Sequence, residues 1–81
     1  MLSIKVLGPG CANCDKVEQI ARQAAATLSL EATIEKVTDR AMWQHYGLLY
    51  TPGLVVNEKL VCGGRVPNPA EVTTWLVDAL A

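Results

Sequence analysis

Two cysteines separated by two residues, Cys11 and Cys14, are the side chains of this chain best suited to chemistry. Such a CxxC pair can form a reversible disulfide, supply two soft thiolate ligands to a metal ion, or pack as two small apolar side chains. The elements on either side of the pair help to choose among these three possibilities.

The flanking sequence predicts that the CxxC pair lies on a turn between a strand and a helix. Apolar and polar residues alternate over residues 1–7, which predicts a strand, and a Gly-Pro-Gly sequence at residues 8–10 ends it. Helical spacing of apolar residues predicts a helix over residues 12–28. Cys11 then lies at the helix N-terminus, where unpaired N–H groups and the helix dipole favour a thiolate. Cys14 lies one turn further on the same face, within reach of Cys11.

Length and composition exclude several classes of function. The chain has 81 residues, 51% of them hydrophobic, and a formal net charge of -1, so we expect one domain over residues 1–81. Without a basic patch or a long apolar run, we expect no nucleic acid and no membrane among its partners. The N-terminus does not resemble a signal peptide, and three cysteines are too few and odd in number for a secreted disulfide scaffold. We therefore expect a cytoplasmic protein, in which a CxxC is redox-active or metal-binding.

The remaining chain predicts an α/β fold with the order β-α-β-α-β-β-α. Apolar patterning, helix caps and turn residues place the later elements at residues 31–37 (strand), 40–46 (helix), 54–56 and 60–62 (strands), and 69 to the C-terminus (helix). A helical crossover makes the first two strands parallel, and the short link before residue 60 makes an antiparallel hairpin. The expected result is a mixed four-stranded sheet with three helices packed on its faces.

A Thr51-Pro52-Gly53 sequence precedes the third predicted strand. Considered alone, Pro52 is a turn proline whose peptide bond is expected to be trans. Together with the CxxC turn about 40 residues earlier and the element order, however, this sequence resembles the thioredoxin-like fold superfamily over essentially the whole chain. More narrowly, it is similar to the small bacterial and archaeal proteins sometimes called redox-active disulfide protein 2, which share a GPGC-x-x-C turn and a TP-x-L strand.

The resemblance implies a specific site. In that superfamily the proline is cis and packs opposite the CxxC, and the residue before it hydrogen-bonds a bound thiol partner through its backbone. It therefore implies that Cys11 and Cys14 are catalytic, and that Thr51, Pro52 and Gly53 bind substrate.

The chain departs from the superfamily pattern at several positions. The residues between the cysteines are Ala-Asn, no tryptophan precedes Cys11, and Lys5 stands where thioredoxins carry a buried acid. If Lys5 points toward the sulfurs, it tunes their pKa values by stabilising thiolates; the alternative, which we favour, is that it extends to solvent. Gly63-Gly64 is similar to the glycine pair of glutaredoxins, but Arg65 follows in place of an acid, so we favour a simple turn over glutathione binding.

Other candidate residues have simpler expected roles. Cys62 is expected to be a buried small apolar side chain, with a regulatory thiol or a third metal ligand as alternatives. His45 is expected on the surface of the second helix. Trp43 and Tyr46 are expected to dock that helix on the core rather than bind a ligand.

Three functional hypotheses follow. The first is a thiol–disulfide oxidoreductase in which Cys11 attacks a disulfide of a protein partner and Cys14 resolves the mixed disulfide. It acts as a monomer, docks partners around Pro9, Pro52 and Gly53, is reduced by an unidentified reductase, and needs no organic cofactor. The second is a module that binds Cu(I), Zn or an iron–sulfur cluster through Cys11 and Cys14. The third is a scaffold that only binds partners.

Overall fold

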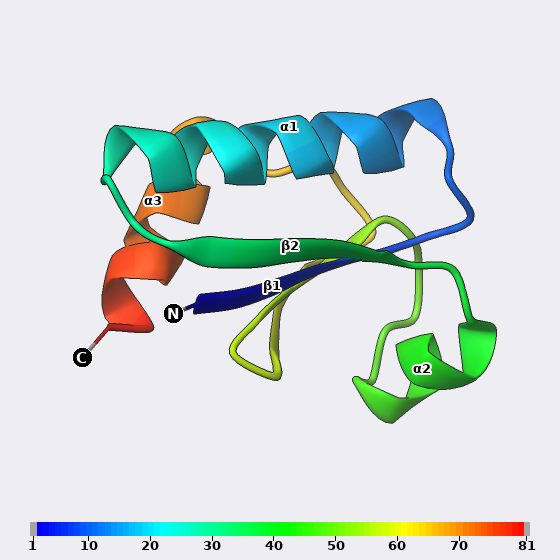
Figure 1. Ribbon diagram of the computed structural model, residues 1–81. Coiled ribbons are helices and arrows are strands. Elements are labelled where there is room, and N and C mark those ends of the chain that lie inside the picture. Colours follow the sequence, from blue (N-terminus) through cyan, green and yellow to red (C-terminus); the bar gives the residue numbers. More distant parts are fainter. Residues whose placement is uncertain (1, 81) are drawn as a thin grey trace.

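The computed structural model describes residues 2–80 and contains the seven elements in the predicted order (Figure 1). They are β1 (Leu2–Leu7), α1 (Ala12–Thr27), β2 (Ala32–Val37), α2 (Arg40–His45), β3 (Gly53–Val56), β4 (Lys59–Gly63) and α3 (Pro69–Asp78). No predicted element is missing, and each boundary falls within a few residues of its expected position. Met1, included in the first predicted strand, and Ala81, included in the last predicted helix, lie outside the described residues.

The strands form one mixed sheet in the order β2-β1-β3-β4. β1 pairs in parallel with β2 and antiparallel with β3, and β3 pairs antiparallel with β4. β1 is therefore an interior strand, and the chain leaves its C-terminal end at Leu7, directly before the CxxC turn. At this end Leu7 pairs with Val37 on one side and with Gly53 on the other. The sheet thus brings the CxxC turn and the Thr51-Pro52-Gly53 segment to the same edge.

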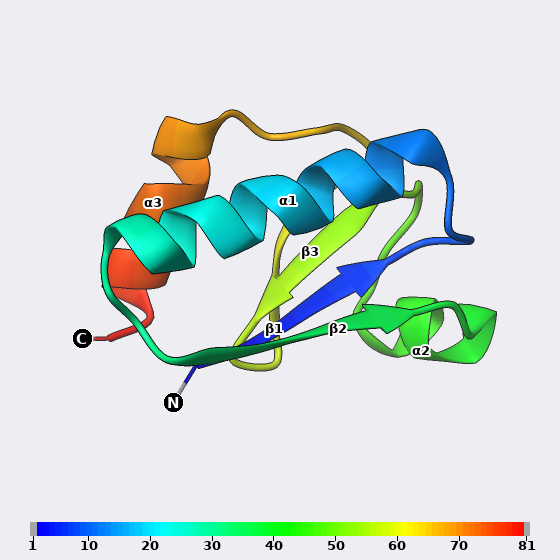
Figure 2. The same ribbon diagram turned by 45° about the horizontal axis from the view of Figure 1, so that its top comes forward.

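The helices cover both faces of the sheet. α1 and α3 pack against each other over one face, whereas α2 lies on the opposite side (Figures 1 and 2). Two hydrophobic clusters correspond to the two faces. The cluster under α1 and α3 contains the buried residues Leu2, Ile4, Val6, Cys14, Val17, Ala21, Ala24, Ala25, Leu54, Val56, Cys62, Val72 and Leu76. The cluster under α2 contains Leu7, Val37, Leu48 and Val55.

Local sequence signals explain where the helices begin. Asn68 accepts from the backbone N–H of Glu71, and the Glu71 carboxylate accepts from the backbone N–H of Asn68, which forms a complete capping box with Pro69 in the first turn. Asp39 caps α2 by accepting from the N–H of Ala41. Such caps satisfy N–H groups that have no partner within the helix. Within residues 2–80, the helices are too short or too polar to cross a membrane.

Candidate active site at the Cys11–Cys14 turn

The candidate site lies where β1 ends and α1 begins. Cys11 is the N-cap residue of α1 with an extended backbone, and its side chain makes no capping hydrogen bond. Cys14 follows inside the first turn, and the N–H of Asp15 closes that turn on the carbonyl of Cys11. In Figure 1 this turn lies at the end of the molecule opposite both chain termini. The Cys11 sulfur therefore does not cap the helix, and it lies exposed at the helix N-terminus.

The two thiols are close in space but differ in exposure. Cys11 Sγ lies 2.8 Å from Cys14 Sγ, and both are free thiols that share a hydrogen bond. Cys11 is exposed, whereas Cys14 retains only 2% of its solvent-accessible surface and belongs to the cluster under α1 and α3. One sulfur can therefore meet a large partner from solution, and the other can reach only the first.

Their surroundings shift the two thiol pKa values in opposite directions. The pKa of Cys11 is lowered, first because the Cys14 thiol hydrogen-bonds its sulfur and then because backbone N–H groups of the first turn point at it. The pKa of Cys14 is raised, chiefly because burial disfavours the thiolate and also because the Cys11 sulfur is a competing negative charge. Of the two thiols, the exposed one therefore ionises more readily.

The segment before β3 lies beside the cysteines. The Thr51–Pro52 peptide bond is cis. Pro52 and Gly53 are buried, Thr51 is half-buried, and the N–H of Gly64 donates to the Pro52 carbonyl at 2.9 Å. Thr51 lies close to the buried sulfur, since both its Cβ and Cys14 Sγ flank Gly8. Of the residues expected to bind substrate, only Thr51 is accessible to a partner.

Two exposed apolar residues next to this segment were not predicted from the sequence. Leu49 is 87% exposed and Tyr50 is 75% exposed, directly before Thr51. Together with Gly47, Leu48, Leu60 and Gly63 they line a surface cavity of about 270 Å³. The sequence did contain a signal: three large apolar residues, Leu48, Leu49 and Tyr50, stand between the helix-ending glycine and the proline, outside any periodic pattern. Exposed apolar side chains that adjoin a reactive group often mark an interaction surface.

Lys5 neither points toward the sulfurs nor extends freely to solvent, the alternative favoured from the sequence, since its side chain is only 19% exposed. Its ammonium group donates to the Tyr46 hydroxyl at 2.9 Å and forms an ion pair with Glu58 at 2.9 Å, and the Tyr46 hydroxyl in turn donates to Glu58. Lys5 alternates with Ile4 and Val6, which face α1, so it lies on the α2 face of β1. These partners raise the pKa of Lys5 well above its usual value, the Tyr46 hydrogen bond first. Its charge is held on the face of the sheet away from Cys14.

The glycine pair after β4 has a packing explanation. A Cβ on Gly63 would lie 2.8 Å from Leu48 Cδ1, and a Cβ on Gly64 would lie 3.3 Å from Tyr50 Cβ. Gly64 also has a φ of +82°, a conformation that favours glycine. The two glycines therefore leave room for residues 48–50. This agrees with the expected structural role of the pair. Arg65 is paired with Glu71 at 2.6 Å.

The remaining candidates lie outside the site. Cys62 is buried in the cluster under α1 and α3, and burial raises the pKa of its thiol. His45 is exposed at the end of α2. Trp43 and Tyr46 pack against the cluster under α2, and the indole N–H of Trp43 donates to the Val37 carbonyl at 2.7 Å. Both aromatics therefore dock α2, as expected.

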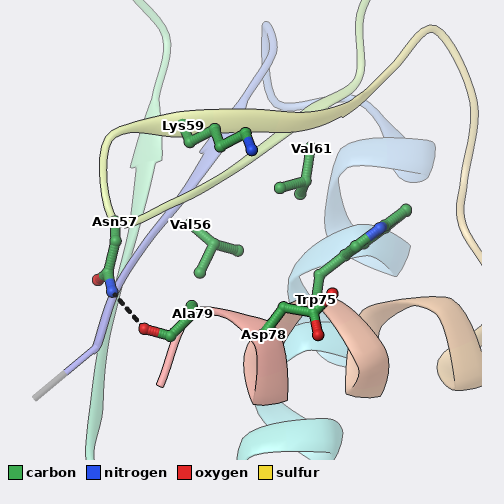
Figure 3. A pocket seen from close by; sticks show the side chains of 7 residues that line it. All are labelled: Val56, Asn57, Lys59, Val61, Trp75, Asp78 and Ala79. Atoms are coloured by element: carbon green, nitrogen blue, oxygen red, sulfur yellow. Dashed lines mark hydrogen bonds between the residues drawn. The ribbon is translucent and has the colours of Figure 1, made fainter. Parts of the chain in front are cut away.

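Other features of the surface are remote from the cysteines or lack ligands. Among residues 2–80, no group of three or more His, Cys, Asp or Glu side chains is arranged to hold a metal ion. A cavity of about 280 Å³ lies between the β3–β4 hairpin and α3, lined by Lys59 and Val61 on the hairpin and by Trp75 on the helix (Figure 3). The N–H of Asn57, at the tip of that hairpin, bonds the Ser3 carbonyl near the start of β1. This cavity is thus at the far end of the sheet and takes no part in the chemistry of the CxxC turn.

Comparison with known proteins gives a consistent family. A family model described as thioredoxin domain matches residues 2–77. The chain is 38% identical over 72 residues to a thioredoxin of Methanothermobacter thermautotrophicus, covering 89% of this chain and 94% of that protein. It is 31% identical over 75 residues to a thioredoxin of Methanocaldococcus jannaschii, covering 89% and 83%.

The fold also matches a solved structure. The crystal structure of Deadhead, a germline-specific thioredoxin of Drosophila melanogaster, superposes with a TM-score of 0.66 at 14% identity. The match covers 95% of this chain and 79% of that one. At this level of identity the match concerns the fold alone, and it agrees with the mixed four-stranded sheet and three helices expected from the sequence.

Proposed function

This chain belongs to the thioredoxin domain family and is a thioredoxin-like disulfide oxidoreductase, and from that premise we propose that Cys11 is its nucleophile and Cys14 its resolving cysteine. One observation carries the assignment of the two roles. An exposed sulfur with a lowered pKa lies 2.8 Å from a buried sulfur with a raised pKa. A nucleophile must be accessible and ionised, whereas a resolving thiol needs only to reach the nucleophile.

The proposed cycle exchanges two electrons with a protein disulfide. The Cys11 thiolate attacks one sulfur of the partner's disulfide, forming a mixed disulfide and releasing the other partner sulfur as a thiolate. Cys14 then loses its proton and attacks Cys11, which releases the second partner sulfur and leaves a Cys11–Cys14 disulfide. The partner gains two electrons and the CxxC pair loses two. An unidentified reductase restores the dithiol, and no organic cofactor is required for either step.

Partner binding is proposed to centre on Thr51. Pro52 and Gly53 are buried, so they act by shaping the backbone rather than by contact, which revises the expectation of a docking surface around them. The accessible apolar groups around the site include those of Pro9, Leu49 and Tyr50. We propose that these side chains receive apolar residues flanking the partner's disulfide. The monomeric state and cytoplasmic location expected from the sequence remain part of this proposal.

The decisive experiment is a redox titration. Purified metal-free protein is equilibrated in thiol–disulfide buffers of graded potential, and free thiols are counted. The proposal requires a two-electron transition that leaves one thiol, Cys62, reduced throughout. A midpoint of about -270 mV would indicate a reductant, and one of about -120 mV would indicate a strong oxidant.

A second outcome would favour metal binding. If Cys11 and Cys14 form no disulfide at any potential, the oxidoreductase assignment is wrong. Stoichiometric metal retained through desalting would then support a soft-metal site, with further ligands from a second copy or another molecule, because Cys11 and Cys14 supply only two. A pair that neither cycles nor binds metal would support the scaffold hypothesis.

A further inference from the structure

Gly8, three residues before Cys11, occupies an unusual position beneath the buried thiol. A Cβ placed on Gly8 would overlap Cys14 Sγ outright, and would lie 3.5 Å from Cys14 Cβ and 3.9 Å from Thr51 Cβ. The sulfur of Cys14 therefore fills the space that a side chain at position 8 would need. Gly8 itself is buried at the end of β1.

Backbone conformation does not explain this glycine. Among the described glycines with positive φ are Gly10, Gly47 and Gly64, and Gly8 is not one of them. Gly10 is the residue of the Gly-Pro-Gly turn that needs such freedom, with a φ of +90° and no atom within 4 Å of its missing Cβ. The two positions of this turn therefore require glycine for different reasons. Gly10 needs it for its backbone conformation, and Gly8 needs it because a sulfur lies where a side chain would be.

We infer that Gly8 is a positioning residue for Cys14: the absence of a side chain creates the recess that holds the resolving sulfur both buried and 2.8 Å from Cys11. The inference rests on the proposed function and specifies how its second step is achieved. A side chain at this position would lift the first turn of α1 from the sheet or rotate the Cys14 sulfur out of the recess.

Gly8 cannot easily move aside to accommodate such a change. Its N–H donates to the Val37 carbonyl at 3.1 Å, which extends the β1–β2 ladder by one residue beyond Leu7. Cys14, for its part, is held by the core cluster under α1. Two anchored elements thus meet at Gly8. Because protein interiors are close-packed, an added methyl group there would displace neighbouring atoms. The exposed sulfur of Cys11 is not among the three atoms nearest to a Cβ at Gly8.

The two steps of disulfide exchange should therefore respond differently to Gly8→Ala. In the test, fully reduced protein reacts with excess Ellman's reagent, an aromatic disulfide that releases a coloured thiolate. Attack by Cys11 releases the first equivalent and leaves a mixed disulfide. Attack by Cys14 on Cys11 releases the second equivalent and leaves the intramolecular disulfide, so the reagent gains the two electrons that the pair loses.

The comparison is made at a pH where Cys11 is ionised in both proteins, so that a weakened hydrogen bond from Cys14 does not slow the first attack. We then expect the rate of the first phase to change by less than about twofold in Gly8→Ala and that of the second to fall by about tenfold or more, since small displacements strongly slow intramolecular reactions. The matched control is Ala25→Val, which enlarges another buried side chain of α1 eleven residues beyond Cys14, about 16 Å along the helix axis. It should leave both phases unchanged. A second phase in Gly8→Ala as fast as in the unmodified chain would overturn the inference.

A stability measurement keeps the inference testable if Gly8→Ala folds poorly. Urea denaturation of Gly8→Ala, Cys14→Ala and the double variant forms a double-mutant cycle. We expect Gly8→Ala to lower the free energy of unfolding less in the Cys14→Ala background, because the competing sulfur is gone. An equal decrease in both backgrounds would contradict the inference. Failure of the proposed function gives a different result, since the unmodified chain itself would then lack the second Ellman phase.

Discussion

Cys11 Sγ and Cys14 Sγ lie 2.8 Å apart, yet the first is exposed to solvent and the second retains 2% of its accessible surface. This contrast arises from the start of one helix. The N-cap residue extends beyond the helix, whereas a residue one turn later faces the sheet when the helix packs on it. Proximity permits exchange between the two sulfurs, and the difference in exposure divides the two chemical steps between them.

Serine substitutions should separate these steps. Cys11→Ser is expected to lower disulfide-reducing turnover by about 10³-fold or more, since a hydroxyl does not replace the thiolate. Cys14→Ser should still attack but should accumulate as a mixed disulfide with its partner. Insulin reduction measures turnover, and non-reducing gel electrophoresis detects the trapped adduct. Turnover retained in Cys11→Ser would disprove the assignment of the nucleophile.

The pH dependence of alkylation should report the hydrogen bond between the thiols. The Cys11 pKa is lowered, first by the Cys14 side chain, so its iodoacetamide reaction should reach half-maximal rate at a pH below that of an ordinary cysteine. Cys14→Ala removes that donor, and the midpoint should rise. Cys14→Ser keeps a hydroxyl donor and should shift it less. Equal midpoints in all three proteins, measured by mass spectrometry of the Cys11 peptide, would argue against this electrostatic coupling.

The resolving step should accelerate with pH over a higher range. The pKa of Cys14 is raised by burial, so the fraction of Cys14 thiolate increases only as pH rises above the ordinary thiol range. The second phase of the Ellman reaction should therefore increase with pH at values where the first phase is already near its plateau. Stopped-flow traces at graded pH test this, and identical profiles for the two phases would contradict it.

Leu49 and Tyr50 should matter for protein substrates and not for small ones. Leu49→Ser and Tyr50→Ser are expected to lower kcat/KM for insulin about tenfold, because each removes an exposed apolar contact beside Thr51. Their rates with Ellman's reagent should not change. Val77→Ser is the control, since Val77 is 48% exposed on α3, on a different part of the surface. An equal loss in Val77→Ser, or none in the two test variants, would remove the docking role.

The capping box predicts an acid limit to stability. The Glu71 pKa is lowered to about 2, first by Arg65 and then by the Asn68 backbone. The carboxylate therefore stabilises the fold fully above about pH 4.5, and this contribution is lost as pH falls through about 2. Glu71→Gln should flatten the Tm profile in that window, and Asn68→Ala should cost about 1 kcal/mol at neutral pH. Glu35→Gln, on an exposed position of β2, should leave the acid profile unchanged.

Much of this fold could be predicted from the sequence because its signals are local. Alternation in β1, helical spacing in α1 and the Asn68-Pro69 cap each depend on residues within one turn or one strand, and all seven elements were identified. The CxxC turn was equally local, since two cysteines three positions apart at a helix start are necessarily neighbours. The proline segment required the resemblance, because nothing near Pro52 shows what lies opposite it.

The less predictable features depend on which side of the sheet each helix covers. The side of β1 that Lys5 occupies follows from α1 packing over Ile4 and Val6, and the sequence offers no means to assign that face. The recess at Gly8 exists only because α1 brings the Cys14 sulfur down onto the end of β1. Spacing along the chain thus determined which residues could react. Contacts between elements far apart in sequence decided which sulfur is buried, on which face of the sheet the Lys5 charge lies relative to the cysteines, and which apolar side chains are exposed to solvent.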